Sequence, residues 1–160
     1  MSDVRTIELQ PVQAGDAAFL LALYRTTREA ELTLVDWSDA QKDAFVAMQY
    51  DAQDRHYRAM YPEAAFDIVI VDGRAAGRFY VDRGRDAISV LDICFSPPHR
   101  GQGLGTALLT SLQEEAAGTG RPVRLHVELG NPAGRLYERL GFVVISEQGL
   151  YRELEWRALT

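Results

Sequence analysis

His99-Arg100-Gly101-Gln102-Gly103-Leu104-Gly105-Thr106 is the stretch that decides the fold of this 160-residue chain. It follows an apolar run, Ala87–Phe95, and a Pro97-Pro98 pair that cannot continue a central strand. From Gly103 onward, apolar residues recur at helical spacing. Glycines between a strand and a helix let the backbone approach a ligand and turn several N–H groups toward one point. The segment predicts a loop that binds a phosphate or pyrophosphate through main-chain atoms, with a purely structural turn as the alternative.

Two common phosphate-binding motifs do not fit this loop. A Walker loop ends in glycine and lysine, and no lysine follows these glycines. The dinucleotide fingerprint G-x-G-x-x-G, started at Gly101, places Thr106 where its third glycine belongs. It would also lie late in the chain rather than after a first strand. The spacing that does fit is R-x-x-G-x-G, formed by Arg100, Gly103 and Gly105.

Downstream of the loop, the pattern predicts a helix, a strand, a short helix and two closing strands. Leu104, Ala107, Leu108, Leu112 and Ala116 share one helix face, and the sequence from Gly118 to Pro122 ends that helix. Alternating apolar residues over 123–129 predict a strand. Asn131-Pro132 is typical of a helix start, Gly141 of a helix end, and 142–145 and 150–156 of strands.

Upstream of the loop, the sequence predicts a strand, two helices and a hairpin. Val4–Leu9 has strand character, and apolar spacing predicts a helix over 16–31. The second helix starts at a Ser38/Gln41 capping box and ends before Pro62. Its apolar stripe is expected at Phe45, Met48, Ala52 and His56. Strands over 66–70 and 76–82 flank an Asp72-Gly73 hairpin turn.

Composition and charge place the chain among ordinary soluble proteins. It is 47% hydrophobic and 25% charged, as is usual for soluble globular chains, and its 160 residues are about the length of one domain. The order of predicted strands and helices then indicates one α/β (mixed α+β) domain over residues 1–160. A net charge of −6 disfavours a nucleic-acid partner. The sequence shows no signal peptide and no apolar run long enough to span a membrane, which favours a cytoplasmic protein. A single cysteine excludes an internal disulfide framework and a Cys-rich zinc site, and the histidines lack chelating spacing, so no metal is expected.

Two segments together resemble the GNAT superfamily of acyl-CoA-dependent N-acetyltransferases. One is the R-x-x-G-x-G loop, and the other is Leu136-Tyr137-Glu138-Arg139-Leu140-Gly141-Phe142, similar to that family's "LYERLGF" helix end. The strand before it, Leu125–Asn131, also resembles the family's fifth strand. The likeness covers about residues 87–145. It implies a twisted mixed sheet of six to seven strands with about four helices, in which two central parallel strands, Ala87–Phe95 and Val123–Leu129, splay apart.

The resemblance implies acetyl-CoA as co-substrate and assigns residues to it. Backbone N–H groups of Gln102–Thr106 would bind the coenzyme pyrophosphate. The loop residues assigned to coenzyme binding are Arg100, Gly101, Gln102, Gly103, Leu104, Gly105 and Thr106. The preceding strand pairs with the pantetheine arm through Ile93, Cys94 and Phe95, and one main-chain N–H there polarises the thioester carbonyl. Asn131 contacts the coenzyme arm, and Tyr137 protonates the departing thiolate.

Elementary acid–base chemistry then requires a base. A primary amine with a pKa near 10.4 is mostly protonated at pH 7 and must lose a proton before it attacks. His126 stands where some relatives carry a glutamate base, and Asp92 is the second candidate. A histidine packed on the sheet and a buried structural carboxylate are the respective alternatives. Cys94 is expected to be a small buried strand residue rather than an acylated nucleophile.

The N-terminal helices and middle strands are expected to form the acceptor pocket. Glu31 or Asp36 would attract an ammonium group, Arg28 would hold a carboxylate, and aromatic residues would wall the pocket. His56 is expected to pack there or in the core rather than to catalyse. The candidates are Tyr24, Arg28, Glu31, Trp37, His56, Tyr57 and Tyr80. A core or surface position is the alternative for each of these residues.

The sequence thus predicts an N-acetyltransferase that moves an acetyl group from acetyl-CoA to the primary amine of a small or amino-acid-like acceptor, by direct transfer in a ternary complex. A peptide N-terminus or lysine side chain is an alternative acceptor. A non-catalytic acyl-CoA sensor is the alternative from another functional class. Related domains often pair, so the sequence leaves a homodimer open.

Overall fold

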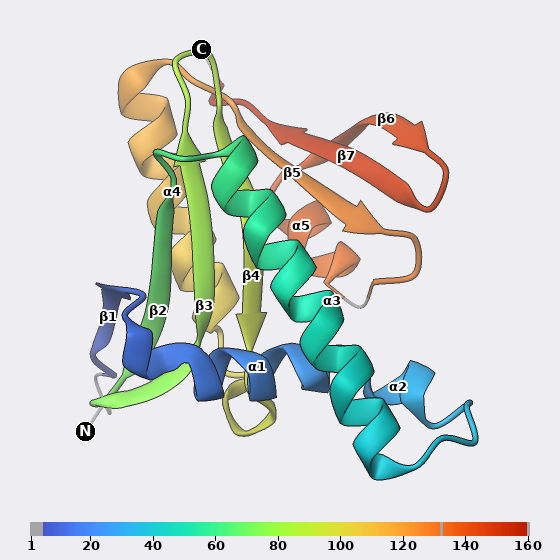
Figure 1. Ribbon diagram of the computed structural model, residues 1–160. Helices are drawn as coiled ribbons and strands as arrows, with labels where there is room; N and C mark the ends of the chain where they lie inside the picture. Colours follow the sequence, from blue (N-terminus) through green and yellow to red (C-terminus); the bar gives the residue numbers. More distant parts are fainter. Residues whose placement is uncertain (1–4, 132, 160) are drawn as a thin grey trace. The chain divides into compact units, whose positions relative to one another are not determined.

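A computed structural model describes residues 5–131 and 133–159, so the expectations placed on Val4 and Pro132 lie outside the described residues. Strands and helices alternate in the predicted order, and two short 3-10 turns, η1 (Ala14–Asp16) and η2 (Pro97–His99), accompany them (Figure 1). The elements are β1 (Ile7–Pro11), α1 (Ala17–Thr26), α2 (Glu29–Leu32), α3 (Asp39–Met60), β2 (Ala65–Val71), β3 (Arg74–Arg83), β4 (Ile88–Phe95), α4 (Leu104–Thr119), β5 (Val123–Glu128), α5 (Gly134–Arg139), β6 (Val143–Gln148) and β7 (Tyr151–Trp156).

The described strands form a seven-stranded mixed sheet in the order β1-β2-β3-β4-β5-β7-β6. β4 and β5 are parallel, whereas β1 with β2, β5 with β7 and β6 with β7 are antiparallel. The α/β class and the parallel central pair are therefore confirmed. The described chain has five α-helices rather than about four, because the first predicted helix is interrupted.

Contacts divide the chain into two compact units. One unit contains the chain up to Phe79 together with Cys94–His99, and the other contains Tyr80–Ile93 and the chain from Arg100 onward. Strands β3 and β4 contribute residues to both units. One domain over residues 1–160 stays a prediction.

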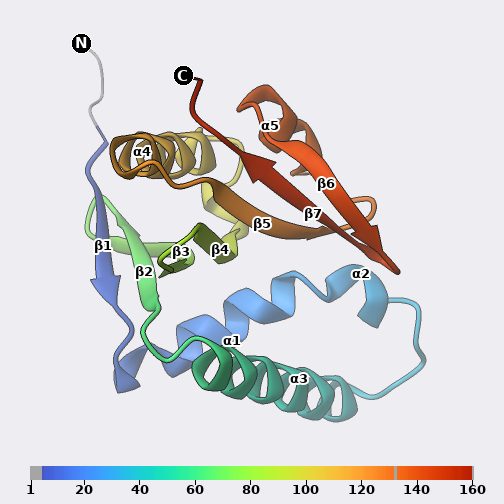
Figure 2. The ribbon, with the colours of Figure 1, turned by 90° about the horizontal axis from the view of Figure 1, so that it is seen from above.

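In the first unit, helices α1 and α3 lie side by side (Figure 2). Tyr24, Leu32 and Val46 form a buried cluster between these N-terminal helices. The predicted capping box at the start of α3 is confirmed, since the Gln41 N–H donates to Ser38 Oγ at 3.2 Å and the Ser38 N–H to Gln41 Oε1 at 2.9 Å. Local polar chemistry therefore fixes where this 22-residue helix begins.

The helix predicted over 16–31 is wrong as one element, because the chain breaks between α1 and α2. The hydroxyl groups of Thr26 and Thr27 donate to the carbonyl oxygens of Leu23 and Tyr24 at 2.7 and 2.6 Å. Threonine hydroxyls that bond nearby carbonyls in this way often bend or end a helix. The break leaves Arg28 at the start of α2.

The predicted apolar stripe of α3 is also wrong beyond Phe45. Met48, Ala52 and His56 are exposed, and the covered face instead runs through positions 45, 46, 49, 50 and 53. Gln53 belongs to this face because its Oε1 accepts a hydrogen bond from Arg78 Nη2 of β3 at 2.8 Å, and Arg78 is buried. A buried guanidinium needs such a partner, so polar satisfaction overrides the apolar spacing.

The β2–β3 hairpin turns at Asp72 and Gly73, as predicted. Both residues have positive φ values, 49° and 81°, which two-residue hairpin turns of the right twist require. The Asp72 carboxylate also accepts the Thr6 N–H at 3.0 Å. The turn thus joins this hairpin to the chain entering β1.

Farther along β3, Gly77 permits close approach of the carbonyl end of β4. A Cβ atom at Gly77 would lie 2.2 Å from the Cys94 carbonyl oxygen and 2.8 Å from Phe95 Cδ1. The Ser96 N–H also donates to the Ala76 carbonyl at 2.8 Å. Glycine is required here because backbone atoms occupy the position of a side chain.

The second unit is organised around α4, which packs on β5 (Figure 1). Leu104, Leu108, Leu112 and Ala116 are buried as predicted, but Ala107 is exposed, and the face turns instead toward Leu109 and Gln113. The helix ends at Thr119, and Gly120 follows with φ of 69°, a left-handed C-terminal cap. Strand β5 ends at Glu128, one residue earlier than predicted, and Leu129 is exposed.

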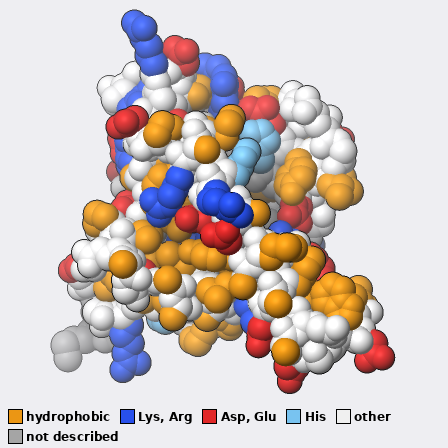
Figure 3. Space-filling view, in the orientation of Figure 1, with side chains coloured by type: hydrophobic (Ala, Val, Ile, Leu, Met, Phe, Trp, Pro, Cys, Tyr) orange, Lys and Arg blue, Asp and Glu red, His pale blue; other side chains and the backbone are white. Residues whose placement is uncertain are grey.

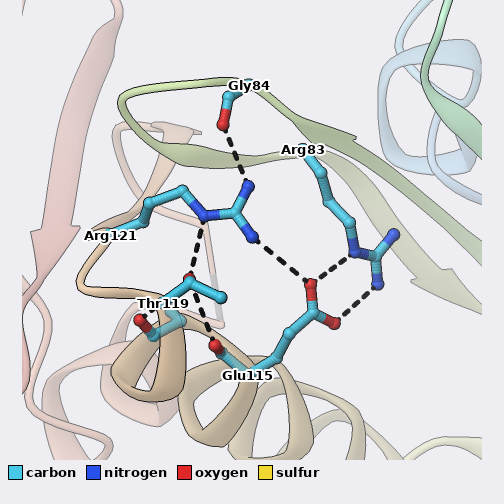
Figure 4. Close-up of polar contacts among 6 residues, drawn as sticks. Arg83, Gly84, Glu115, Thr119 and Arg121 are labelled. Atoms are coloured by element: carbon cyan, nitrogen blue, oxygen red, sulfur yellow. Dashed lines mark hydrogen bonds and ion pairs between the residues drawn. The ribbon is translucent and has the colours of Figure 1, made fainter.

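A polar network ties the end of β3 to the last turns of α4 (Figure 4). Arg83 donates to both Glu115 carboxylate oxygens, at 2.6 and 3.0 Å. Arg121 donates to the Gly84 carbonyl at 3.0 Å and to Thr119 Oγ1 at 2.9 Å, and its Nη2 lies 4.0 Å from Glu115 Oε2. The hydrogen bonds from Arg83 lower the pKa of Glu115 against the opposing effect of its partial burial.

The surface mixes charges of both signs with apolar side chains (Figure 3). Among the described residues, no helix is both long and apolar enough to cross a membrane. The edge strand β6 exposes Val143, Val144 and Ile145, and its register with β7 shifts between Val144 and Ser146. Such a bulge disfavours continuous pairing with another strand.

Substituting Gly77→Ala should destabilise the protein by about 1–3 kcal/mol, because the new methyl group would overlap the Cys94 carbonyl. Gly118→Ala is the matched control, since nothing lies within 4 Å of that exposed helical position. It should be neutral or stabilising by up to about 1 kcal/mol. Urea unfolding measures both variants, and equal stability of the two would contradict the assigned close approach.

Glu115→Gln should remove an acid-sensitive part of the stability. Because the folded pKa of Glu115 lies below its ordinary value of 4.5, this carboxylate stabilises the fold above that pH. The wild-type advantage should be constant above about pH 4.5 and should shrink as the pH falls through the lowered pKa. Unfolding free energies at several pH values test this, with Glu114→Gln as the control for loss of one charge.

Candidate active site

The glycine-rich loop leads into the first turn of α4. Gly101 and Gly103 have φ values of 71° and 78°, a left-handed conformation that favours glycine. Residues 101–103 are exposed, whereas Leu104 is buried and anchors the start of the helix. The loop is therefore held at one end by the core and open to a ligand at its glycines.

The N-terminus of α4 has the chemistry of an anion site. The first backbone bond of the helix runs from the Ala107 N–H to the Gly103 carbonyl at 3.0 Å. The N–H groups of residues 104–106 precede this ladder and project out of the helix at its N-terminal end. Over 16 residues, the aligned peptide dipoles add partial positive charge at the same end. This arrangement suits a phosphate or pyrophosphate group.

Parallel strands β4 and β5 pair only at their beginnings. Their register comprises Ile88↔Val123, Ser89↔Arg124 and Val90↔Leu125, although β4 continues to Phe95 and β5 to Glu128. A pocket opens past this last pair, and both strands contribute to it. The predicted splaying of two central strands is thus present. Between such strands, a ligand can approach backbone groups of a sheet interior.

The pocket brings together five of the predicted site residues from β4, β5 and the α5 region. Asp92 and Ile93 come from β4, His126 from β5, and Asn131 and Tyr137 from the segment that follows. Cys94 and Phe95 are not part of this lining. Among the described residues, the lining is formed by Val90, Leu91, Asp92, Ile93, Leu125, His126, Val127, Asn131 and Tyr137.

Tyr137 is fixed by the end of α5. It is 5% exposed, and its ring meets the Phe142 ring edge-on, with 5.9 Å between centroids. The Tyr137 carbonyl accepts the Phe142 N–H at 3.0 Å, and Gly141 has φ of 92°, confirming the predicted helix end. A phenol held in this way keeps one orientation toward the pocket.

Asn131 shapes the turn before α5 rather than beginning the helix. Its Oδ1 accepts the Ala133 N–H at 2.8 Å, and its carbonyl accepts the Gly134 N–H at 3.1 Å. The helix begins at Gly134 with Ala133 as its N-cap, so the predicted N-cap role of Asn131 is wrong. The side chain forms a local asparagine turn, which competes with a helical start at that position.

Comparison with known proteins identifies the family. Residues 25–142, more than half of the chain, match the acetyltransferase (GNAT) family. The chain belongs to this family. It is also 31% identical over 104 residues to mycothiol acetyltransferase of Nocardiopsis dassonvillei, a match that covers 65% of this GNAT chain and 32% of that protein. The chain therefore spans about a third of the length of this curated relative.

Solved structures share the GNAT fold. PaiA N-acetyltransferase of Thermoplasma acidophilum, determined with coenzyme A, has a TM-score of 0.71 at 18% identity, with 96% of this chain and 99% of that chain covered. An acetyltransferase from Thermus thermophilus has a TM-score of 0.69 at 17% identity, with coverage of 96% and 97%. At these identities, the likeness shows the fold alone.

The two candidate bases of this GNAT chain differ in exposure. Asp92 is half-buried in β4, whereas the His126 side chain is 66% exposed. His126 lies opposite Glu153 in the β5–β7 register, with 3.9 Å between His126 Nε2 and Glu153 Oε2. Glu153 also accepts a hydrogen bond from Ser146 Oγ at 3.4 Å. Both candidates line the pocket, so geometry keeps both available for proton transfer.

The acceptor candidates occupy several environments, and none of them lines the pocket between β4 and β5. Arg28 donates to Tyr24 Oη at 3.2 Å and to Glu31 Oε1 at 3.0 Å. Burial lowers the pKa of Arg28, but these two hydrogen bonds and charges raise it on balance, so the guanidinium stays charged. Asp36, the second candidate for attracting an ammonium group, is exposed and does not line this pocket.

The remaining candidates are aromatic or imidazole side chains. Tyr24 and Tyr80 are buried, Tyr57 is half-buried, and His56 is exposed, so the expected packing of His56 is wrong. Trp37 is 40% exposed and meets Phe45 edge-on, with 5.2 Å between ring centroids. His56 is exposed because the buried face of α3 is rotated toward Gln53, which leaves His56 outside that face.

Two polar residues of the site region escaped the sequence reasoning. Glu153 faces His126, and Gln113 connects α4 to the end of α5. Neither belongs to a local motif, since their partners lie 27 residues away in sequence. A glutamine on an otherwise apolar helix face is the only available signal for Gln113.

Proposed function

We propose that this protein is an N-acetyltransferase that moves an acetyl group from acetyl-CoA to a primary amine. The observation that carries the proposal is the parting of β4 and β5 after Val90↔Leu125, which opens a pocket lined by Tyr137. Family membership supports acyl transfer, and the coenzyme-bound PaiA structure shows that the fold accommodates coenzyme A in that protein. In this proposal, the thioester lies between the separated strands.

The glycine-rich loop would hold the coenzyme pyrophosphate. Backbone N–H groups of Gln102–Thr106 and the positive end of α4 would bind its oxygens, with Arg100 beside them. The segment around Ile93 would run alongside the pantetheine arm, and Asn131 would contact that arm at the pocket. The side-chain oxygen of Asn131 already caps a turn, so its amide group is the part that would meet the coenzyme.

Transfer would proceed by direct attack in a ternary complex. A base removes one proton from the ammonium, and the amine lone pair attacks the thioester carbonyl carbon. A main-chain N–H near Ile93 stabilises the carbonyl oxygen as it gains charge. The carbon–sulfur bond then breaks, and Tyr137 donates its phenolic proton to the thiolate. The nitrogen of the new amide gives up its second proton, and this proton restores the Tyr137 phenol. The products are the acetylated amine and free coenzyme A.

His126 is the proposed base, with Asp92 as the alternative on the other strand. The exposed position of His126 lets it exchange its proton with water after each turnover. Asp92 is half-buried in the strand that would carry the pantetheine arm. Both lie in the same pocket lining as Tyr137, so base and acid would serve opposite ends of one reaction.

We further propose a small or amino-acid-like amine as acceptor. Arg28 and Glu31 form a paired cation and carboxylate in the N-terminal helices, and such groups suit the charges of an amino-acid-like molecule. The relative from Nocardiopsis dassonvillei is named for mycothiol, a small molecule, which is consistent with a small acceptor. A screen of amines with acetyl-CoA, in which the release of free thiol is measured, identifies the acceptor and distinguishes peptide amines from small ones. Coenzyme binding without thiol release from any amine would instead favour an acyl-CoA sensor.

Tyr137→Phe should lower kcat by about a hundredfold while leaving the affinity for acetyl-CoA within about twofold, because only the proton donor is lost. Tyr151→Phe is the matched control, since Tyr151 is half-exposed on β7 and outside the pocket lining. Steady-state thiol release measures both variants. An unchanged kcat for Tyr137→Phe would remove the acid from this mechanism.

Gly103→Ala should weaken coenzyme A binding by about tenfold or more, because a side chain disfavours its left-handed backbone and the loop must shift. Gly149→Ala is the matched control: it has φ of 59° and nothing within 4 Å, but it lies in the β6–β7 turn. Its cost in stability should be similar, with unchanged coenzyme affinity. Isothermal titration with coenzyme A compares the two, and equal affinities would contradict the loop assignment.

A further inference from the structure

Gln113 is a buried polar residue on the apolar face of α4. It is 9% exposed, and the other buried residues of this helix are leucines and an alanine. A buried amide is costly unless it is hydrogen-bonded. Its Nε2 donates to the Leu140 carbonyl oxygen at 2.9 Å. The residue therefore joins α4 to a backbone group 27 positions farther along the chain.

The accepting carbonyl belongs to the C-terminal cap of α5. This helix has six residues, Gly134–Arg139, and isolated helices of that length are unstable in water. The last carbonyl groups of a helix also lack partners within the helix. Gln113 supplies a hydrogen-bond donor to the Leu140 carbonyl. Gly141 and Phe142 turn the chain back at the same point. Figure 2 shows α4 and α5 on the same side of strands β5, β7 and β6.

Tyr137 lies one turn before Leu140 on this short helix. The Leu140 N–H donates to the Tyr137 carbonyl at 3.2 Å, so the two residues share one hydrogen-bonded turn. A shift of the Leu140 carbonyl therefore moves the Tyr137 backbone as well. Since Tyr137 lines the pocket, the position of its hydroxyl depends on where the end of α5 is held.

We propose that Gln113 is a positioning residue for Tyr137, an inference that rests on the proposed acid role of that tyrosine. Helix α4 begins at the glycine loop and carries Gln113 nine residues after Leu104. These nine residues span about 14 Å of rigid helix at 1.5 Å per residue. The same helix would then set the coenzyme pyrophosphate at one point and the proton donor at another, which keeps thioester and acid in register.

Gln113→Met tests this role, because methionine keeps the length of the side chain and removes the donor. We expect kcat to fall about tenfold, with the affinity for acetyl-CoA changed by less than about twofold. In a Tyr137→Phe background, the same substitution should have little further effect, because the group that it positions is absent. If the double variant instead lost kcat by the product of the two single-variant factors, the two residues would act independently and the proposal would be overturned.

Leu112→Met is the matched control on the neighbouring buried position. It introduces the same residue, methionine, into the α4 core without removing a hydrogen-bond donor. Its effect on kcat should be under about twofold. Gln113→Asn provides a second variant in case the methionine variant folds poorly: it retains an amide but falls one methylene short of Leu140, so kcat should again fall. An unchanged kcat in both variants would overturn the proposal.

A measurement without turnover separates this inference from the proposed function. In protein labelled with 3-fluorotyrosine, the 19F resonance of Tyr137, assigned by its loss in Tyr137→Phe, should shift or broaden in Gln113→Met and stay unchanged in Leu112→Met. An unmoved resonance in Gln113→Met would overturn the positioning role even if Tyr137 is the acid. A shifted resonance with normal activity in Tyr137→Phe would instead refute the acid while the contact from Gln113 to α5 stands.

Discussion

The site depends on one constraint: two parallel strands begin as partners and then separate. β4 and β5 share a register at Ile88–Val90 and Val123–Leu125, so their starting ends are fixed within one sheet. Past that point, their side chains line a pocket instead of continuing a common ladder. A sheet interrupted in this way offers main-chain groups of its interior to an extended ligand, which a fully paired sheet does not. In the proposed function, a coenzyme held at the glycine loop reaches its reaction partner only through this opening.

Helix α4 contributes to the site in three separate ways. Its first turn presents backbone N–H groups, its apolar face packs on β5, and Gln113 reaches the end of α5. Its last turns are tied to the end of β3 through Glu115 and the two arginines around it. One rigid element thereby relates the anion site to the helix that carries Tyr137. Gln113, the buried polar side chain of this helix, has a hydrogen-bond partner in the Leu140 carbonyl.

Local signals in the sequence predicted the fold well, whereas signals that depend on distant partners did not. The Ser38/Gln41 box and the Asp72-Gly73 turn need only neighbouring residues, and both are confirmed. The stripe of α3 was misplaced because the buried partner of Gln53 lies on β3. Gln113 was not predicted as a site residue for the same reason, since its partner Leu140 lies 27 residues away in sequence. The pocket residues Ile93, His126, Asn131 and Tyr137 were found through the family resemblance, since periodicity alone gives no reason for two paired strands to part. Asp92 was found as an isolated carboxylate within an apolar strand.

The most direct test of the central claim is a titration of isotopically labelled protein with coenzyme A, in which NMR measures the backbone amide chemical shifts at each step. If the thioester arm enters between the separated strands, the largest changes should fall on two groups of amides, Leu91–Ile93 in β4 and Gln102–Thr106 at the start of α4. Both groups should saturate with one dissociation constant. Saturable binding that leaves the β4 amides unchanged, or no binding at millimolar coenzyme A, would contradict the account.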